Sequence, residues 1–307
     1  MDFIGRDILS TEDLTREDIM AIMKVTGEME DRAKKERVFS LLSDRLVAVI
    51  FLEPSTRTRL SFVAAVHRLG AKPVVVADAR SSSAQKGESL ADMARTVEGY
   101  VDCICIRQPK TGGAKEVADA VQIPVINGGD GSGQHPTQAL LDLYTIQKEK
   151  GTVEGLKVAM LGDLKYGRTV HSLSYVLKDF QPEYLFCSPD ELKMPEHIIT
   201  DLEKKGIKCT QTSRLEDALD ADILYMTRIQ KERFDDPAEY DRLKGSYVLN
   251  KEQVEKGRDG ILVMHPLPRV DEIALDVDNL PNAAYFRQAH NGVFLRMALL
   301  AMVLGKA

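Results

Sequence analysis

Residues 46–69 read LVAVIFLEPSTRTRLSFVAAVHRL. The opening run, Leu46–Leu52, is entirely apolar, which predicts a strand buried on both faces of a parallel sheet. The closing run, Thr56–Leu69, has the length and composition of a helix that covers such a sheet. A buried strand that passes through a short polar loop into a helix is the repeating unit of α/β proteins.

The same alternation continues along the chain. Short apolar runs predict further strands at Pro73–Ala77, Cys103–Ile106, Pro124–Ile126, Lys157–Leu161, Glu183–Cys187, Ile207–Thr210, Ile223–Met226 and Ile261–Met264. Longer amphipathic segments predict helices at Thr15–Glu36, Ser89–Gly99, Ala114–Ala120, Pro136–Lys150, Thr169–Lys178, Pro195–Lys205, Leu215–Leu219 and Val293–Leu304. The sequence therefore predicts an α/β fold with mainly parallel sheets flanked by helices.

The length of 307 residues favours two domains, at roughly 150 residues each. Gly151 is a stop signal for the helix before it, and a new strand–loop–helix unit begins at Lys157, so we expect the boundary within 135–155. We take residues 1–135 as the first domain and residues 136–291 as the second. The apolar C-terminal helix must be buried, and we expect residues 292–307 to pack back onto the first domain.

The charge balance excludes several classes of partner. Lys and Arg total 41 against 47 for Asp and Glu, a net charge of −6, which makes the chain a poor general ligand for nucleic acid or for an anionic membrane. No signal peptide is visible, and no stretch approaches the ~18 apolar residues of a membrane span. The four cysteines form no C-x-x-C pair, and we expect reduced thiols in a cytoplasmic protein. No set of Cys and His residues has metal-ligand spacing, so no metal is expected.

The loop in the opening stretch, Ser55-Thr56-Arg57-Thr58-Arg59, has the composition of an anion site. The first turn of a helix leaves N–H groups unpaired and carries a partial positive charge, and hydroxyl and guanidinium groups add further donors for a phosphate. Arginine is unfavourable beside the positive end of a helix dipole, so two arginines in one first turn indicate an anion nearby. In the structural alternative, Ser55 caps the helix and the arginines are solvated.

A second polar loop, residues 128–138, reads GGDGSGQHPTQ. Pro136 is a favoured first residue of a helix, which places His135 at the start of that helix and Gln138 further into its first turns. A neutral imidazole and an amide can bind a small polar carbonyl or amine group. The alternative is that His135 only caps the helix.

Residues 162–169 read GDLKYGRT and nearly match the nucleotide-binding pattern G-x-x-x-x-G-K-[ST]. Arg168 stands where that pattern has lysine, and the two are not interchangeable, because the lysine acts as a compact point charge. The chain also has no G-x-G-x-x-G, so neither a P-loop nor a dinucleotide site is expected. An arginine at a strand–helix junction suits a carboxylate.

Two more segments follow predicted strands of the second half. Arg228 and Gln230 stand two residues apart and can face one pocket from an extended chain. Residues 265–269 read HPLPR, and the two prolines predict a rigid loop whose backbone carbonyls can point at a ligand, with a purely structural turn as the alternative. Weaker candidates are Ser82 and Lys86 in a polar loop and Arg107 at the end of a strand.

In this order, the five motifs resemble the aspartate carbamoyltransferase family, in its catalytic chain. The resemblance is carried by S-T-R-T-R, G-D-G-S-x-Q-H-P-T-Q, G-D-L-K-Y-G-R-T-V-H-S, T-R-x-Q-K-E-R and H-P-L-P-R. It implies one domain for carbamoyl phosphate, residues 1–135, and one for L-aspartate, residues 136–291. It also implies transfer of the carbamoyl group to the aspartate amine, giving N-carbamoyl-L-aspartate and phosphate, in de novo pyrimidine biosynthesis.

The resemblance implies a role for each matched residue. Ser55, Thr56, Arg57 and Thr58 would bind the phosphate, and Arg107 would bridge the phosphate and the carbonyl oxygen. His135 would bind the carbonyl oxygen, and Gln138 the carbamoyl amide. Arg168, Arg228 and Gln230 would bind the two aspartate carboxylates. The backbone carbonyls of Pro266 and Leu267 would orient the reacting nitrogens in a loop shaped by Pro268. The expected catalytic residues are Arg57, Thr58, Lys86, Arg107 and His135.

In the family, Ser82 and Lys86 reach into the site of a neighbouring subunit, which implies a homotrimer with shared active sites. No cofactor is expected, because fixed hydrogen-bond donors suffice to stabilise the charge that develops on the carbonyl oxygen. Matching positions suggest that Glu53 pairs with Arg168 or Arg233. The resemblance leaves open whether a separate regulatory chain binds, and it leaves open the effect of three departures from the family pattern, Gln85, Gln108 and Gly133.

Two other interpretations stay open at this point. Ornithine carbamoyltransferases share S-T-R-T-R and the fold, but they typically have H-C-L-P where this chain has H-P-L-P, and a cationic substrate would be repelled by Arg168 and Arg228. A catalytically inactive homologue that serves as a binding subunit is the other alternative, against which the retained polar site residues argue.

Overall fold

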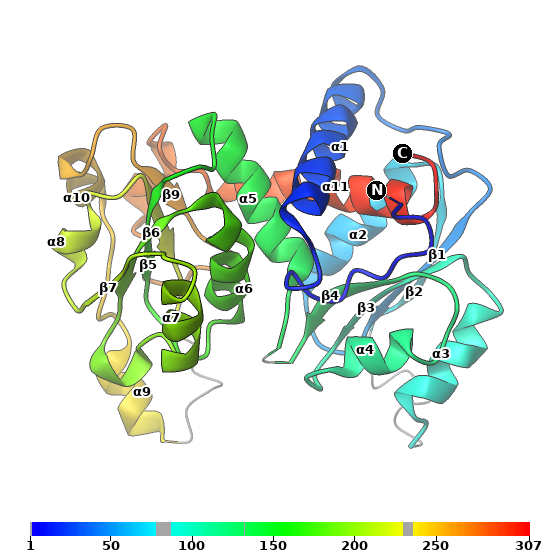
Figure 1. Cartoon of the computed structure of the whole chain (residues 1–307), viewed down its shortest axis with the longest axis horizontal. Coiled ribbons are helices and arrows are strands. Elements are labelled where there is room, and N and C mark those ends of the chain that lie inside the picture. The colour runs from blue at the N-terminus through cyan, green and yellow to red at the C-terminus, as the bar shows by residue number, and fades with distance from the viewer. Residues whose placement is uncertain (1, 78–86, 132, 230–235) are drawn as a thin grey trace. The chain divides into compact units, whose positions relative to one another are not determined.

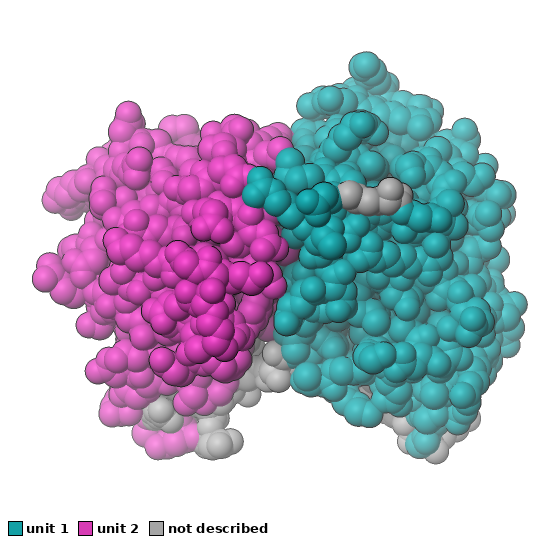
Figure 2. Space-filling view, in the orientation of Figure 1, with its two compact units in different colours: residues 1–144, 290–307 teal, residues 145–289 magenta. Residues whose placement is uncertain are grey.

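The computed structural model of the chain describes residues 2–77, 87–131, 133–229 and 236–307. Contacts divide the chain into two compact units, residues 1–144 with 290–307 (unit 1) and residues 145–289 (unit 2), coloured separately in Figure 2. The chain passes from one unit to the other within two helices, α5 (Pro136–Lys150) and α11 (Tyr285–Val303). Each unit contains a parallel sheet flanked by helices, so the predicted fold class is confirmed.

Unit 1 has a four-stranded parallel sheet in the order β2-β1-β3-β4. Its strands are β1 (Leu46–Phe51), β2 (Lys72–Val76), β3 (Cys103–Gln108) and β4 (Val125–Asp130). Its helices, besides its parts of α5 and α11, are α1 (Arg16–Lys35), α2 (Thr56–Arg68), α3 (Leu90–Glu98) and α4 (Gly113–Ala118). Every element predicted for this half is present, and the largest difference is at β4, which continues through two glycines to Asp130.

The residues of β1 alternate between the two faces of this sheet. Ala48 and Ile50 pack in a cluster with Val117 of α4. Phe51 points to the other face, where its ring lies 6.3 Å from the ring of Phe62 in α2. In Figure 1, α3 and α4 lie on one side of the sheet, and α2 lies on the other. Because helices cover both faces, β1 is buried along its whole length except at Leu46.

Unit 2 has a five-stranded parallel sheet in the order β7-β6-β5-β8-β9. Its strands are β5 (Lys157–Leu161), β6 (Glu183–Cys187), β7 (Cys209–Thr212), β8 (Ile223–Met226) and β9 (Leu262–Met264). Its helices, besides its parts of α5 and α11, are α6 (Arg168–Leu177), η3 (Lys178–Phe180), η4 (Asp190–Leu192), α7 (Glu196–Glu203), α8 (Leu215–Ala218), α9 (Pro237–Leu243), α10 (Lys251–Lys256) and η6 (Leu275–Asn279).

Both faces of this second sheet are also covered. Ala159 and Leu161 of β5 join a buried cluster with Leu215 of α8 and Val254 of α10. Met160, between them in sequence, contacts the opposite layer, where its sulfur lies 3.5 Å from the Ser174 hydroxyl of α6. The alternation along β5 therefore repeats the pattern of β1, as expected for a strand in a doubly covered parallel sheet.

Three features of unit 2 differ from the prediction. Two short helices, α9 and α10, were not expected, and β7 begins and ends two residues later than the predicted run Ile207–Thr210. The last helix, α11, begins at Tyr285 rather than at Val293, because its first two turns carry polar side chains that hide the apolar pattern. Tertiary packing thus extends this helix beyond its periodic segment.

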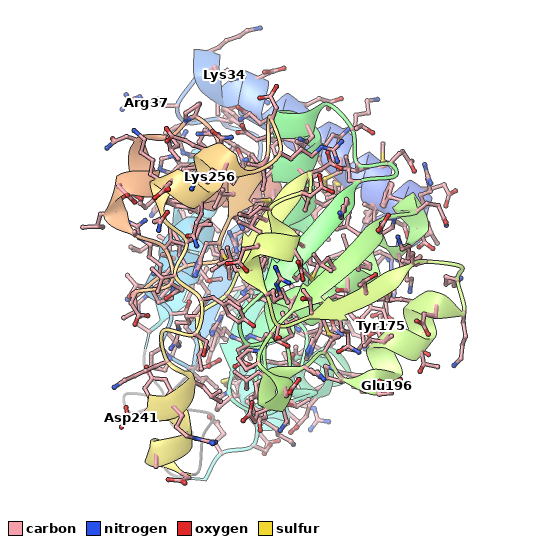
Figure 3. All side chains as sticks on the ribbon, turned by 90° about the vertical axis from the view of Figure 1, so that its left-hand side faces the viewer. Lys34, Arg37, Tyr175, Glu196, Asp241 and Lys256 are labelled. Carbon is pink, nitrogen blue, oxygen red and sulfur yellow. The ribbon has the colours of Figure 1, made fainter. Side chains whose placement is uncertain are left out.

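Charged side chains cover the outside of the molecule. Asp241 of α9, Lys256 of α10 and Glu196 of α7 are exposed, and Figure 3 shows them projecting from their helices. Many such groups form local pairs, such as Lys256 with Glu252 at 2.6 Å, and exposed pairs of this kind contribute at most ~1 kcal/mol. Within the described ranges, no helix combines the length and the apolar character needed to cross a membrane.

Candidate active site

In unit 1, three neighbouring strands carry the candidate residues just beyond their carboxyl ends. β1 leads into the Ser55–Arg59 turn, β3 ends with Arg107 and Gln108, and β4 leads into the loop before α5. Because these strands are adjacent and parallel, their carboxyl ends meet at one edge of the sheet, where α/β proteins bind ligands. The fold thus brings to one edge Ser55, Thr56, Arg57, Thr58, Arg107, His135 and Gln138.

The first turn of α2 has the features of an anion site. Ser55 has the extended backbone of an N-cap residue, but its side chain makes no capping hydrogen bond. The turn contains no acidic residue. Arg59 donates to the carbonyl of Ala77 at 3.1 Å, whereas Arg57 is exposed. Ser55 is thus the N-cap residue, as the structural alternative expected, but its hydroxyl does not make the capping hydrogen bond.

Arg107 is held between two acceptors in the interior of unit 1. Its side chain is 10 % exposed, its Nε lies 3.2 Å from Glu53, and its Nη1 donates to the carbonyl of Gly128 at 3.3 Å. Burial lowers the pKa of Arg107, and the Glu53 carboxylate opposes that shift. The ion pair fixes the direction of the guanidinium. From the sequence we expected Glu53 to pair with Arg168 or Arg233, and its contact with Arg107 was not considered.

The described residues between β4 and α5 are tied together by backbone hydrogen bonds. Asp130 accepts hydrogen bonds from two backbone N–H groups, at 2.9 and 2.8 Å. Gly131 has a φ of +54°, and a Cβ there would come within 2.4 Å of the Pro109 carbonyl, so only glycine fits. The buried His135 begins the helix, since its carbonyl accepts from the N–H of Gln138 at 2.9 Å. This backbone presents His135 and Gln138 in fixed positions.

A buried arginine of α11, which the sequence motifs did not include, links that helix to α2 and α5. Arg296 of α11 is 2 % exposed and donates to Ser61 of α2 at 2.9 Å and to Thr137 of α5 at 3.2 Å. Its guanidinium lies 4.9 Å from the ring centre of Phe62. Burial lowers the pKa of Arg296 to about 10, so it remains a cation at neutral pH. The signal in the sequence was a lone arginine within the otherwise apolar segment Val293–Leu304.

In unit 2, three neighbouring strands carry the other candidates in the same manner. β5 leads to Arg168, the first residue of α6, and β8 leads to Arg228. β9 leads to Pro266, Leu267 and Pro268. These strands are adjacent in the order β5-β8-β9, so their carboxyl ends also meet at one edge.

The junction of β5 and β8 depends on a glycine. Gly162 has a φ of +108°, and a Cβ there would lie 2.2 Å from the carbonyl of Thr227, which no other residue could accommodate. Thr227 in turn donates its N–H and its hydroxyl to the carbonyl of Leu161, at 2.8 and 3.0 Å. A pocket opens here, and its lining includes Gly162, Thr227, Arg228, Tyr240, Lys244 and Asp271. The wall contains two cations, Arg228 and Lys244, and two carboxylates, Asp271 and Glu272, so an anionic ligand would depend on where the cations point rather than on the total charge.

A buried histidine holds the loop that follows β9. Nδ1 of His265 accepts from the N–H of Leu267 at 2.8 Å, so the ring proton is on Nε2, which donates to Glu272 at 2.7 Å. Leu267 has a φ of +51°, which a leucine rarely adopts, and its bond to His265 stabilises that conformation. Such backbone outliers concentrate at functional sites. Arg269 of the same motif binds Asp278 and Tyr285 and is structural.

Three candidates, Ser82, Lys86 and Gln230, lie outside the described residues, as does Gln85. Among the residues that the structure does describe, no group of three or more His, Cys, Asp or Glu side chains could hold a metal ion. The two strand edges instead offer guanidinium, hydroxyl, imidazole and amide donors together with backbone carbonyls. These groups bind phosphate, carboxylate and amine ligands.

Two family profiles match the chain in succession. The aspartate/ornithine carbamoyltransferase carbamoyl-P binding domain matches residues 6–148, and the Asp/Orn binding domain of the same family matches residues 154–303. The chain is 51 % identical over 308 residues to the aspartate carbamoyltransferase catalytic subunit of Methanocella arvoryzae. It is 49 % identical over 306 residues to that of Thermococcus onnurineus, and both alignments cover 99 % of each sequence.

Solved structures agree with the sequence comparisons. The catalytic subunit of Methanocaldococcus jannaschii aspartate transcarbamoylase has a TM-score of 0.92 at 49 % identity, with 98 % of each chain covered. The Trypanosoma cruzi aspartate transcarbamoylase, solved with carbamoyl phosphate and aspartate, has a TM-score of 0.93 at 39 % identity, again over 98 % of each chain.

Proposed function

The chain belongs to the aspartate/ornithine carbamoyltransferase family, and from this premise we propose that it is a carbamoyltransferase acting on L-aspartate. The reaction transfers the carbamoyl group of carbamoyl phosphate to the aspartate amine and yields N-carbamoyl-L-aspartate and phosphate. This product is the one expected of an early step in pyrimidine biosynthesis. Near-full-length relatives at about half identity with the same catalytic-subunit name support this function.

We assign carbamoyl phosphate to the strand edge of unit 1. The first turn of α2, with Ser55, Thr56, Arg57 and Thr58, binds the phosphate. The carbamoyl carbonyl oxygen receives hydrogen bonds from Arg107 and His135, and the carbamoyl amide meets Gln138. As the amine attacks the carbonyl carbon, negative charge builds on this oxygen and then on the departing phosphate. Fixed donors stabilise that charge without reorganising, which is typically worth ~3–4 kcal/mol for a single donor.

We assign aspartate to the strand edge of unit 2. Arg168 and Arg228, with Gln230, bind the two carboxylates as charge-assisted hydrogen-bond donors. The carbonyls of Pro266 and Leu267 accept hydrogen bonds from the reacting nitrogens and orient them for attack. The hydrogen bond from the Leu267 N–H to His265 supports this role, because it holds the carbonyl-bearing backbone in one conformation. Binding both substrates in a reactive orientation supplies the entropic part of the rate enhancement.

One observation favours aspartate rather than ornithine as the substrate. Two arginines, Arg168 and Arg228, follow the neighbouring strands β5 and β8. They attract the second carboxylate of aspartate and repel the ammonium group of ornithine. The purified protein, given carbamoyl phosphate with either amino acid in parallel, is expected to form product with aspartate alone. Product with ornithine alone, or no product with either, would overturn the proposal, and the second result would leave the inactive-homologue alternative.

We further propose a homotrimer whose sites are shared through Ser82 and Lys86, in the cytoplasm. The trimer rests on the resemblance of the motifs. The compartment is supported by the four cysteines, which are all free thiols, since secreted proteins usually pair them.

Shared sites predict that two inactive variants complement each other. Lys86→Ala and Arg57→Ala subunits are mixed in equal amounts, unfolded and refolded together. If each site takes Arg57 from one subunit and Lys86 from its neighbour, random assembly restores about a quarter of the wild-type activity. Each variant taken alone through the same procedure is the control. Mixed trimers that are verified by mass and yet show no recovery would contradict the sharing of sites.

A further inference from the structure

A buried carboxylate stands behind Gln138. Nε2 of Gln138 donates a hydrogen bond to Oδ1 of Asp142 at 2.8 Å. Asp142 follows Gln138 by four residues on α5, so the two side chains lie on one face of the helix. Asp142 is completely buried, whereas Gln138 is partly exposed. The Asp142 carboxylate also interacts electrostatically with the buried Arg296.

This contact decides which way the Gln138 amide points. A carboxylate only accepts hydrogen bonds, so the amide must turn its NH2 group toward Asp142. The opposite orientation would bring two oxygens together inside the protein. The Oε1 atom of Gln138 therefore points away from Asp142 and serves as an acceptor of fixed position.

We propose that Asp142 is a positioning residue which, through Gln138, makes the carbamoyl phosphate site selective for a ligand that ends in NH2 over one that ends in a methyl group. The inference rests on the proposed function and deepens it. A carbamoyl and an acetyl group have nearly the same size and shape, so a pocket cannot separate them by packing. A fixed acceptor can, because a methyl group leaves it unpaired.

The simpler interpretation is that Gln138 and Asp142 only stabilise α5. Pairs of this spacing strengthen a helix slightly, and Lys115 with Asp119 on α4 is an exposed example at 2.7 Å. Such a pair needs no burial, yet Asp142 is fully enclosed, and burying a carboxylate is costly. The two interpretations differ in one measurable respect, which is whether Asp142 affects a ligand with NH2 differently from a ligand with a methyl group.

Two stable phosphonates supply that comparison. Phosphonoacetamide ends in C(=O)NH2 and acetonylphosphonate in C(=O)CH3, and their affinities are measured by calorimetry without aspartate and without turnover. Wild-type protein is expected to favour phosphonoacetamide by about tenfold or more. Asp142→Leu is expected to weaken phosphonoacetamide about tenfold and acetonylphosphonate less than twofold. Asp142→Asn keeps an oxygen in place and is expected to fall between wild type and Asp142→Leu.

A double variant tests whether Asp142 acts through Gln138. In a Gln138→Met background the selectivity is already lost, so Asp142→Asn is expected to change neither affinity by more than about twofold. The control, Asp119→Asn, removes the exposed pair and is expected to change neither affinity. Because Asp142→Asn preserves the shape of the side chain, these measurements decide the question even if Asp142→Leu does not fold.

Three results would overturn the inference. Asp142 substitutions that weaken both phosphonates equally, or that act undiminished in the Gln138→Met background, would show that Asp142 acts through packing. Wild-type protein that binds the two phosphonates equally well would overturn this inference alone. Wild-type protein that binds neither would overturn the proposed function as well.

Discussion

Replacing Arg57 by alanine is expected to lower kcat about 10³-fold, the upper end of the loss seen when one transition-state donor is removed. Arg57 is exposed in the first turn of α2, where a guanidinium faces the positive end of the helix dipole. Because exposed side chains contribute little to stability, we expect the thermal unfolding midpoint to stay within about 2 °C of wild type. Steady-state kinetics and thermal denaturation of the same preparation measure the two effects.

Arg59→Ala is the matched control. Arg59 stands two residues later in the same turn, but its side chain donates to the carbonyl of Ala77 at 3.1 Å. Removing it takes away a cation of the same kind at a similar place, and kcat is expected to change by less than about threefold. Equal losses of kcat in the two variants would mean that general positive charge matters rather than Arg57. A loss of stability that matches the loss of activity in Arg57→Ala would indicate a structural role.

The strands could be predicted because burial on both faces leaves a plain signal. β5, β6 and β8 have the bounds that their apolar runs predicted, and β1 differs only at its last residue. α9 and α10 could not be predicted from apolar periodicity, since they are short and contain few apolar residues. A different signal existed for α10, because Asn250 and Gln253 form a capping box, which spacing alone can reveal.

The segments that form the candidate site could be predicted from the sequence. The residues that hold their side chains in place could not. Each motif lies beyond the carboxyl end of a strand, so the position of Arg107 or Arg228 followed from the fold class. The partners that orient these residues come from distant positions, and no local pattern encodes them. Arg296 lies 235 residues from Ser61, which it binds, and the pairing of Glu53 with Arg107 depends on the neighbouring positions of β1 and β3.

His265→Leu is expected to lower the free energy of unfolding by about 3–5 kcal/mol. The side chain of His265 is 1 % exposed and that of Glu272 is 8 % exposed. The substitution leaves two groups without their partner, the N–H of Leu267 and the Glu272 oxygen that His265 now contacts at 2.7 Å. Urea denaturation measures the loss. The same substitution at His197, which is exposed on α7 of the same unit, is the control and is expected to change stability by no more than about 0.5 kcal/mol.

The loss of unfolding free energy in His265→Leu is expected to be larger at neutral pH than at acidic pH. Burial acts to raise the pKa of Glu272, but hydrogen bonds from His265 and from the backbone outweigh it and lower that pKa below its ordinary value of 4.5. In wild type this carboxylate therefore adds stability above about pH 4.5, and the contribution is lost as the pH falls. Without His265 only the backbone hydrogen bonds to Glu272 remain and the contribution is smaller, so the difference between variant and wild type is expected to be larger at pH 7 than at pH 4. A difference that stays constant with pH would show that the loss comes from packing alone.

His265→Asn separates the two bonds of the ring. The asparagine oxygen can still accept from the N–H of Leu267, whereas its shorter side chain does not reach Glu272 as the imidazole does. If the Leu267 bond positions the carbonyls of Pro266 and Leu267, His265→Asn is expected to keep a kcat at least about tenfold above that of His265→Leu, while both lose stability. Steady-state kinetics at a temperature where both variants are folded measures this. Equal kcat values would mean that the histidine stabilises unit 2 without orienting the loop, and the roles of Pro266 and Leu267 would then have to rest on another contact.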